Sequence, residues 1–338
     1  MRLPRRSCYN MRWGWRADVR RALGGCVLLA ALAACGGTTR GTARVTIPAG
    51  ASFRAAADSL HNAGFVEFPR LFRAYAKLTG HDRDIKAGTY VLRRGLGWGE
   101  LVDALYRGEG LERRITIPEG WSLKEIVPVL ARELGAPEDS VRAAVRDTAL
   151  LHALDVPTPT LEGYLFPDTY LFSYGTSPRA AVTEMVRRFR QVWQPAWDER
   201  LQQLAMNRND IVTLASIIEK EATLAEERPV ISAVYHNRLR ARMPLQADPT
   251  VQYALGEHRD RVLYKDLEVA SPYNTYRRVG LPPGPIASPG RASLVAALYP
   301  AAVPYLYFVA HPDGHHEFRT TFRDHTLAKA EVRRQRPR

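Results

Sequence analysis

Residues 210–222 read DIVTLASIIEKEA, a stretch that predicts one amphipathic helix at the centre of the second half of the chain. At about 100° per residue, its apolar side chains cover more than half of the helix circumference. Glu221 falls within this apolar arc, and Glu219 falls toward its edge. The polar side chains predicted for the opposite face are Thr213, Ser216 and Lys220. The pattern therefore predicts two carboxylates beside a hydrophobic core.

The two glutamates have two interpretations. Removing a carboxylate from water is unfavourable and raises its pKa, and a carboxyl with a raised pKa can donate a proton near neutral pH. On this interpretation Glu221 is the candidate proton donor and Glu219 its flanking partner. The alternative is that both are ordinary solvated helix residues beside Lys220. Asp210, or Asn209, is the expected N-cap of the helix.

Length and composition indicate a globular protein of more than one domain. The chain has 338 residues, of which 46% are hydrophobic and 25% charged, and no long low-complexity tract interrupts it. The formal net charge is +13, which favours a polyanionic partner such as nucleic acid, anionic lipid or an acidic wall polymer. The basic residues are scattered and no nucleic-acid-binding motif accompanies them, so no nucleic-acid partner is predicted.

The N-terminus has the order of an export signal or membrane anchor. Residues 1–34 contain seven arginines and one aspartate, and the apolar run ALGGCVLLAALAA occupies Ala22–Ala34. This run is shorter than the about 20 residues of a spanning helix. LAAC, ending at Cys35, resembles a bacterial lipobox, so lipidation of Cys35 is the alternative to an uncleaved anchor over 1–35. Either form tethers the chain to a membrane with its bulk outside the cytoplasm.

Three similar segments organise the first half after a short tether, GGTTRGTA, at 36–43. The segments read VTIPAGASFRAAADSL (45–60), TYVLRRGLGWGELVDAL (89–105) and ITIPEGWSLKEIVPVL (115–130). Each predicts a strand, a turn and a helix, and we expect a binding or spacer region over 44–155. From 156 to 338 the chain becomes rich in aromatic residues, followed by a long helical block and a β-like run at 305–318. The fold class expected is therefore α+β.

Two further segments suit a carbohydrate cleft. QADPTVQYAL (246–255) offers Asp248 as the N-cap of a short helix, Pro249 at its first position, and Thr250. The loop SPYNTYRRVGLPPGPIASPG (271–290) offers aromatic, amide and hydroxyl groups, namely Tyr273, Asn274, Thr275 and Tyr276. The alternative is a structural loop whose tyrosines fill the core. HPDGHH (311–316) lacks a helical H-x-x-x-H spacing, so no metal site is expected.

These stretches, in this order, resemble the endolytic murein transglycosylase family, the YceG-like proteins. The matching motifs cover about residues 43–330 and read AGTYVLRRGLGWGELVDAL, EGYLFPDTY, LASIIEKEATLAEERPVISAVYHNRLRARMPLQADPTVQYALG, SPYNTYRRVGLPPGPIASPG and YLYFVAHPDGHHEF. The resemblance implies a small LysM-like module, over 44–155, followed by a mostly helical, lysozyme-like transglycosylase domain with a β portion, over 156–338. It implies that the second glutamate of E-K-E, here Glu221, is catalytic. The short apolar segment ending in Cys35 departs from the uncleaved membrane helix common in the family.

The resemblance implies non-hydrolytic cleavage of the β-1,4 bond between N-acetylmuramic acid and N-acetylglucosamine. This reaction leaves a 1,6-anhydro end on nascent strands and helps to terminate their elongation; it needs no cofactor. Substrate-binding candidates are Glu219, Asp248, Thr250, Tyr273, Asn274, Thr275 and Tyr276. Expected partners are peptidoglycan strands and polymerases, at the cell inner membrane. Two alternatives stay open: a muramidase that pairs Glu221 with Glu219 or Asp168, and a non-catalytic, peptidoglycan-binding envelope lipoprotein.

Overall fold

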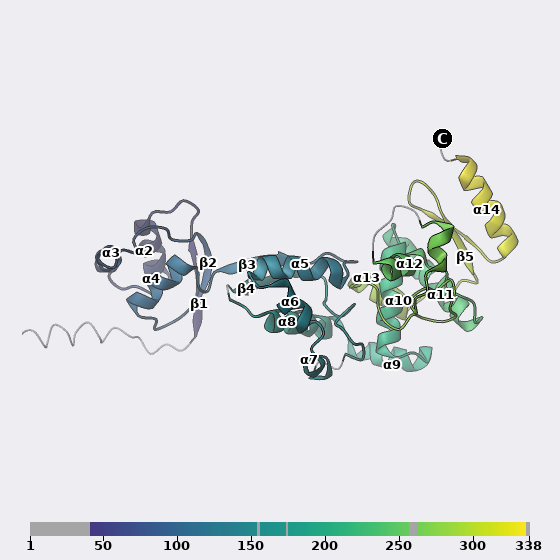
Figure 1. The fold of residues 1–338 in the computed structure, drawn as a ribbon, viewed down its shortest axis with the longest axis horizontal. Helices are drawn as coiled ribbons and strands as arrows, with labels where there is room; N and C mark the ends of the chain where they lie inside the picture. The colour runs from purple at the N-terminus through teal and green to yellow at the C-terminus, as the bar shows by residue number, and fades with distance from the viewer. Residues whose placement is uncertain (1–40, 154–155, 174, 257–261, 336–338) are drawn as a thin grey trace, which may run out of the picture. The chain divides into compact units, whose positions relative to one another are not determined.

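The computed structural model describes residues 41–153, 156–173, 175–256 and 262–335. The predicted signal or anchor at 1–35, and most of the tether at 36–43, lie outside these ranges. No helix among the described residues combines the length and the apolar character that crossing a membrane requires. The structure is mixed α and β, with small two-stranded sheets (Figure 1).

The chain divides into two compact units after Glu112. The sequence predicted a boundary near residue 156, with all three strand–helix segments before it. The third segment, 115–130, belongs instead to the second unit, because Ile115, Ile126 and Leu130 are buried in the core of that unit. A repeat in sequence therefore does not mark a common domain here.

Within residues 41–112, the first unit has two antiparallel strands and three helices: β1 (Thr42–Ile47), α2 (Phe53–Asn62), α3 (Pro69–Leu78), β2 (Gly88–Arg93) and α4 (Trp98–Arg107). Thr42 pairs with Arg93 and Ile47 with Gly88, which fixes the register of β1 against β2. Alternate β1 residues, Val45 and Ile47, are buried because strand side chains point to opposite faces in turn. They join the helices in a separate hydrophobic core.

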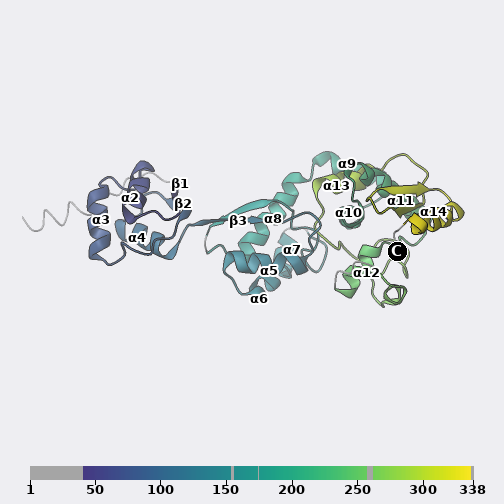
Figure 2. The same ribbon diagram turned by 90° about the horizontal axis from the view of Figure 1, so that it is seen from above.

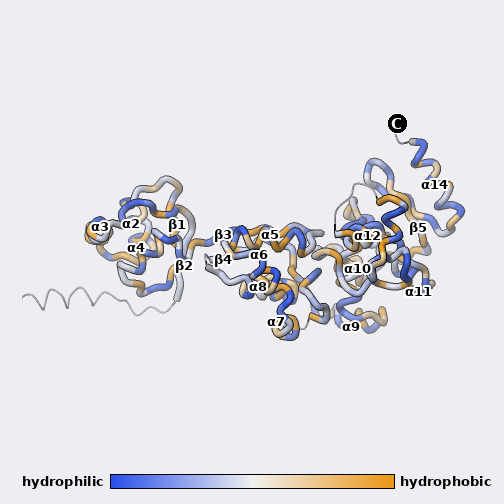
Figure 3. Tube along the Cα trace, viewed as in Figure 1, coloured by the Kyte–Doolittle hydropathy of each residue, from blue (hydrophilic) through white to orange (hydrophobic). Residues whose placement is uncertain are grey.

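The second unit is mostly helical. Its elements are β3 (Glu112–Thr116), α5 (Leu123–Leu134), α6 (Glu138–Ala144), α7 (Thr148–Ala153), β4 (Thr169–Ser173), α8 (Pro178–Val192), α9 (Pro195–Leu204), α10 (Arg208–Glu221), η1 (Ala225–Glu227), α11 (Arg228–Arg240), α12 (Asp248–Leu255), η2 (Tyr264–Glu268), α13 (Arg291–Leu298), β5 (Tyr307–Ala310), β6 (His316–Arg319) and α14 (Phe322–Gln335). β3 pairs with β4 and β5 with β6. Hydrophobic and hydrophilic residues alternate along its helices (Figure 3).

Helix α10 is the centre of this unit. It packs against α11, α12 and α13, and both ribbon views show it among them (Figures 1 and 2). Every residue from 211 to 218 is buried. The predicted polar face is therefore wrong for Thr213 and Ser216, which are only 1% and 0% exposed, whereas Lys220 is exposed as predicted. Ser216 satisfies its hydroxyl by donating to the Thr213 carbonyl at 2.7 Å and accepting from the Ile286 amide at 3.0 Å, which explains why burial is tolerated.

The helix also begins earlier than predicted. Its N-cap is Asn207, not Asp210 or Asn209. The Asn207 side chain accepts from the Asp210 amide, and the Asp210 carboxylate accepts from the Asn207 amide, both at 2.9 Å. This reciprocal pair is a capping box, in which Asp210 takes the third position of the helix. The cap of α12 differs in the same way, because Ala247 is its N-cap and Asp248 its first residue.

Gly163 is required by close packing beside α10. It has φ +79°, and a Cβ at this position would lie 2.4 Å from the Pro285 Cβ and 3.2 Å from the Val212 Cγ1. Backbone strain and a clash with neighbouring side chains therefore act together. Gly135 has φ +67°, and no atom lies within 4 Å of the place that a Cβ would occupy there. It provides a matched comparison with strain alone.

We expect Gly163→Ala to lower the free energy of unfolding of the second unit by about 3 kcal/mol or more, because positive φ and overpacking both oppose the methyl group. Gly135→Ala is expected to lower it by about 1 kcal/mol. Urea unfolding followed by circular dichroism measures both. Equal losses for the two variants would contradict the packing role of Gly163.

Candidate active site

Glu221 is the last residue of α10, where the buried helix meets α11 and α12. Its Oε1 accepts a hydrogen bond from the Tyr235 hydroxyl at 3.1 Å. Burial raises the pKa of the Glu221 carboxyl to about 7, with the nearby Asp248 carboxylate acting in the same direction and Tyr235 and Arg238 in the opposite one. A carboxyl in this range can hold a proton at neutral pH and release it during a reaction.

Helix α11 supplies the two groups that favour the ionised form of Glu221. Tyr235 is 1% exposed, and its ring makes an edge contact with Phe308 at 6.0 Å between centroids. Arg238 is 7% exposed and donates to the carbonyls of Leu306 and Leu245, both at 2.7 Å. These contacts hold both side chains in place, so Glu221 faces an environment with little freedom to rearrange.

Asp248 approaches Glu221 from the N-terminus of α12. Its Oδ1 accepts from the Tyr276 hydroxyl at 2.5 Å, and a carboxylate is favoured in the first turn of a helix. Burial and hydrogen bonding to Asp248 raise the pKa of Tyr276, with a further contribution from Glu221. The structure thus brings together Glu221, Asp248 and Tyr276, three of the residues singled out from the sequence.

Glu219 has different partners from Glu221. Its carboxylate accepts from the Gly290 amide at 2.9 Å and pairs with Arg228 at 3.5 Å, and its side chain is only 7% exposed. The helical wheel placed Glu219 at the edge of the buried arc, whereas the side chain is enclosed by the start of α13. Sequence analysis missed its neighbour Glu119, whose pKa is raised first by burial and then by the charge of Glu219.

Asn274, Thr275 and Thr250 lie in the interior. Asn274 is 0% exposed and donates to the carbonyls of Leu267 and Val269 at 2.8 and 3.0 Å. Thr250 and Thr275 contact each other through their hydroxyls at 2.9 Å. Because these polar atoms serve the protein itself, their placement favours a role in shaping the 271–290 loop. Direct contact with a ligand stays a prediction for them.

Tyr273 is partly buried and packs against Tyr253 of α12, with 4.8 Å between ring centroids. Asp168, the alternative second carboxylate, forms an ion pair with Arg188 of α8 at 2.6 Å. Glu219 and Asp168 are thus both engaged by arginines. In the part of the chain that the structure describes, histidine, cysteine, aspartate and glutamate form no cluster suited to a metal ion.

Sequence analysis also missed Tyr235, Arg238 and Glu162. Glu162 is 5% exposed, and burial raises its pKa to about 7. The available signal for α11 was spacing, because Tyr235 and Arg238 lie three residues apart and so share one helix face. For Glu162 the signal was a carboxylate directly before the apolar and aromatic run GYLFP at 163–167.

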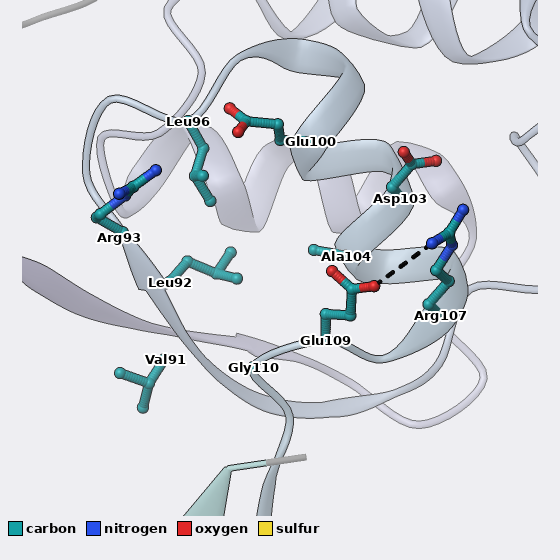
Figure 4. Close-up of a pocket in the computed structure, with 10 residues that line it drawn as sticks. All are labelled: Val91, Leu92, Arg93, Leu96, Glu100, Asp103, Ala104, Arg107, Glu109 and Gly110. Carbon is teal, nitrogen blue, oxygen red and sulfur yellow. Dashed lines mark ion pairs between the residues drawn. The ribbon is translucent and has the colours of Figure 1, made fainter. Parts of the chain in front are cut away.

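The first unit contains a separate groove between β2, α4 and the turn that follows α4 (Figure 4). Leu92, Leu96 and Ala104 provide apolar surface. Arg107 and Glu109 stand at its border and form an ion pair at 3.7 Å. This groove lies within the predicted binding or spacer region and shares no residue with the Glu221 site.

A model of the YceG-like family matches residues 45–331. The chain belongs to this family. Over 304 residues it is 36% identical to the endolytic murein transglycosylase of Bacillus subtilis, covering 85% of this chain and 84% of the relative. It is 30% identical to the enzyme of that name from Streptococcus pneumoniae strain D39, covering 79% of this chain and 54% of the relative. The crystal structure of a YceG-like protein from Listeria monocytogenes matches with a TM-score of 0.60 at 34% identity, covering 86% of this chain and 100% of that one.

We expect Glu221→Gln to stabilise the protein at alkaline pH. A carboxyl whose pKa rises from 4.5 to about 7 on folding binds more protons in the folded state between these values. Stability therefore falls as pH rises through this range, by on the order of 3 kcal/mol. Glutamine keeps an acceptor for Tyr235 and has no charge to bury.

Thermal unfolding at pH 4 and pH 8 measures this effect. The variant should match the wild type at pH 4, where both side chains are neutral, and exceed its melting temperature at pH 8. Equal melting temperatures at pH 8 would show that ionised Glu221 is not desolvated.

Proposed function

We propose that this YceG-like protein is an endolytic lytic transglycosylase that cleaves the glycan strands of peptidoglycan through Glu221. The observation that carries the proposal is the Glu221 carboxyl, which lies at the end of a buried helix, accepts a hydrogen bond from Tyr235 and has a pKa of about 7. The names of the relatives from Bacillus subtilis and Streptococcus pneumoniae support the same activity.

In the proposed reaction, protonated Glu221 donates its proton to the oxygen of the β-1,4 bond between N-acetylmuramic acid and N-acetylglucosamine. The bond from C1 of the muramyl residue to that oxygen breaks, and a hydroxyl forms on the leaving sugar. The C6 hydroxyl of the same muramyl residue then attacks C1. The Glu221 carboxylate takes the proton of this hydroxyl, so the acid is regenerated and a 1,6-anhydro end remains.

One carboxyl is sufficient for this reaction because the nucleophile belongs to the substrate. An intramolecular hydroxyl avoids most of the entropic penalty of recruiting water, whereas hydrolases generally use a second carboxylate. The muramidase alternative needs Glu219 or Asp168 in that second role. Each of these is held by an arginine, Arg228 and Arg188 respectively, which favours the single-acid mechanism. The products distinguish the two, since a muramidase leaves a reducing end.

A non-catalytic envelope lipoprotein is the remaining alternative. A protein that only binds glycan has no need for a carboxyl whose ionised form is destabilised by burial. Buried titratable groups with shifted pKa values gather at functional sites, and Glu221 lies beside a loop rich in tyrosine. These features favour an enzyme.

We assign Tyr273 and Tyr276 to contact with sugar rings, Asp248 to orientation of Glu221, and Glu219 to fixing the last turn of α10. The first unit would bind or space the glycan, and the tether would hold the enzyme at the inner membrane through residues 1–35 or a lipidated Cys35. Nascent strands, and the polymerases that make them, are the proposed partners. The chemistry needs no cofactor.

Glu221→Gln is expected to abolish the formation of anhydromuramyl ends, because glutamine can neither donate nor take up the proton. Mass spectrometry of purified peptidoglycan digested with the full chain measures these ends. Glu226→Gln, a change at an exposed glutamate of η1, is the matched control and should retain activity. Reducing ends from the wild type would replace this proposal with the muramidase.

Tyr235→Phe is expected to shift the alkaline limb of the pH profile of kcat/KM toward higher pH. The Tyr235 hydroxyl stabilises the ionised form of Glu221 and so lowers its pKa. Without it the general acid stays protonated to a higher pH. The shift should be about half a pH unit to one unit, followed by the rate of release of anhydromuramyl products from pH 5 to 9. A limb that moves to lower pH would contradict the assignment.

A further inference from the structure

Glu162 is a buried carboxyl that the proposed reaction does not use. It lies in the segment between α7 and β4 and is 5% exposed. Both of its oxygens are within hydrogen-bond distance of the Leu123 amide, at 3.1 and 3.2 Å. Leu123 is the first residue of α5, so the carboxylate satisfies an amide that the helix itself leaves unpaired. The second partner of Glu162 is the Tyr253 hydroxyl, which donates to Oε2 at 3.2 Å.

Tyr253 belongs to α12, and Glu162 therefore connects the end of α12 to the start of α5. A second contact between the same elements comes from the Lys124 ammonium, which donates to the carbonyl of Gly256 just after α12. The Tyr253 ring also packs on Tyr273 of the 271–290 loop. These contacts attach the C-terminal turn of α12 to the rest of the second unit.

The opposite end of α12 carries Asp248, whose charge acts on Glu221. The helix contains eight residues, Asp248–Leu255, which is only about 12 Å of helix. A helix this short moves as one piece when an attachment at one end is released. Because Tyr253 and Asp248 share this short helix, a shift of its C-terminal turn can be transmitted to Asp248, which the Tyr276 hydroxyl also contacts.

We propose that Glu162 is a positioning residue which, through the Tyr253 hydroxyl, fixes α12 and so places Asp248 beside Glu221. The inference rests on the proposed function, in which Glu221 is the acid. Glu162 acts through α12, so it influences turnover without touching the substrate. The contact between Glu162 and Tyr253 thus contributes, through Asp248, to the raised pKa of the Glu221 carboxyl.

The expected effect follows from the charges around the two carboxyls. The groups that face Glu221 are Asp248 from α12, Tyr235 and Arg238 from α11, and Tyr276 from the loop. The groups that face Glu162 are the amides of Leu123 and Gly163, the Tyr253 hydroxyl, Tyr273 and Glu125. Among the neighbours of Glu221, Asp248 is the carboxylate that raises the Glu221 pKa. Displacement of Asp248 therefore lowers this pKa, and Glu221 loses its proton at a lower pH.

The test uses the full chain and three variants: Tyr253→Phe, Glu162→Ala and the double variant. Rates of release of anhydromuramyl products are measured from pH 5 to 9 at several substrate concentrations. We expect the pH midpoint of the alkaline limb of the kcat/KM profile to move lower by about one pH unit in each single variant. KM should stay within about twofold, and the double variant should be no worse than the worse single one, because both break the same connection.

Two further variants separate positioning from general destabilisation. Glu162→Gln keeps an amide that can hydrogen-bond the Tyr253 hydroxyl. The pH midpoint of its alkaline limb should therefore lie within a few tenths of a pH unit of the wild-type value. Tyr299→Phe removes a hydroxyl from a tyrosine that is 44% exposed and should leave the profile unchanged. Tyr253→Phe keeps the ring and its packing, so it tests the proposal even if Glu162→Ala fails to fold.

A melting temperature that falls in Tyr253→Phe with an unmoved alkaline limb would overturn the proposal, as would additive effects in the double variant. Titration of the Glu221 carboxyl by carbon-13 NMR provides a readout that needs no turnover: its pKa should fall in Tyr253→Phe. If the wild type yields no anhydromuramyl ends, the proposed function fails, and this titration still decides the positioning role. If the wild type is active and the titration is unchanged, the positioning role alone fails.

Discussion

The complete burial of α10 is the constraint on which the rest of the second unit depends. Residues 211–218 are enclosed on all sides, so even Thr213 and Ser216 lie in the core. Charged groups can reach the surface or a partner only at the ends of such a helix. At the N-terminus the charge of Asp210 is used in the capping box with Asn207, and at the C-terminus Glu221 accepts from Tyr235 while burial raises its pKa. The acid character of the site is thus a consequence of packing.

Buried carboxylates also hold the helices around α10 in place. Glu219 joins its last turn to the start of α13 and to Arg228, and Glu162 joins α5 to α12. Each accepts from a backbone amide near the beginning of a helix, where the orphan N–H groups and the helix dipole favour a negative charge. Backbone amides are thus partners of Glu219 and Glu162, whereas Glu221 accepts a hydrogen bond from the Tyr235 hydroxyl and lies near the Asp248 carboxylate.

Glu221 is unfavourable for stability in its ionised form, and this is what makes it suited to act as both acid and base. A pKa of about 7 leaves the two protonation states close in free energy at neutral pH, so proton transfer in either direction meets no large penalty. Asp248 and Tyr235 adjust that balance in opposite senses. Functional sites commonly retain such destabilising groups because replacing them would remove activity.

The sequence by itself determined that a helix occupies most of 210–222, that Glu221 is a candidate beside an apolar arc and that the family motifs are present, because these depend on local periodicity and on residue types in order. The sequence-based predictions were wrong where burial and contacts depend on residues that are distant along the chain. A helical wheel assumes one solvated face, and α10 has none over 211–218, so Thr213 and Ser216 were misplaced. The third strand–helix segment resembles the first but packs in a different unit. Tyr235 lies 14 residues from Glu221, and Tyr253 lies 91 residues from Glu162. Only the tertiary structure decided these partners, since hydrogen bonds and desolvation depend on distance in space and not on position along the chain.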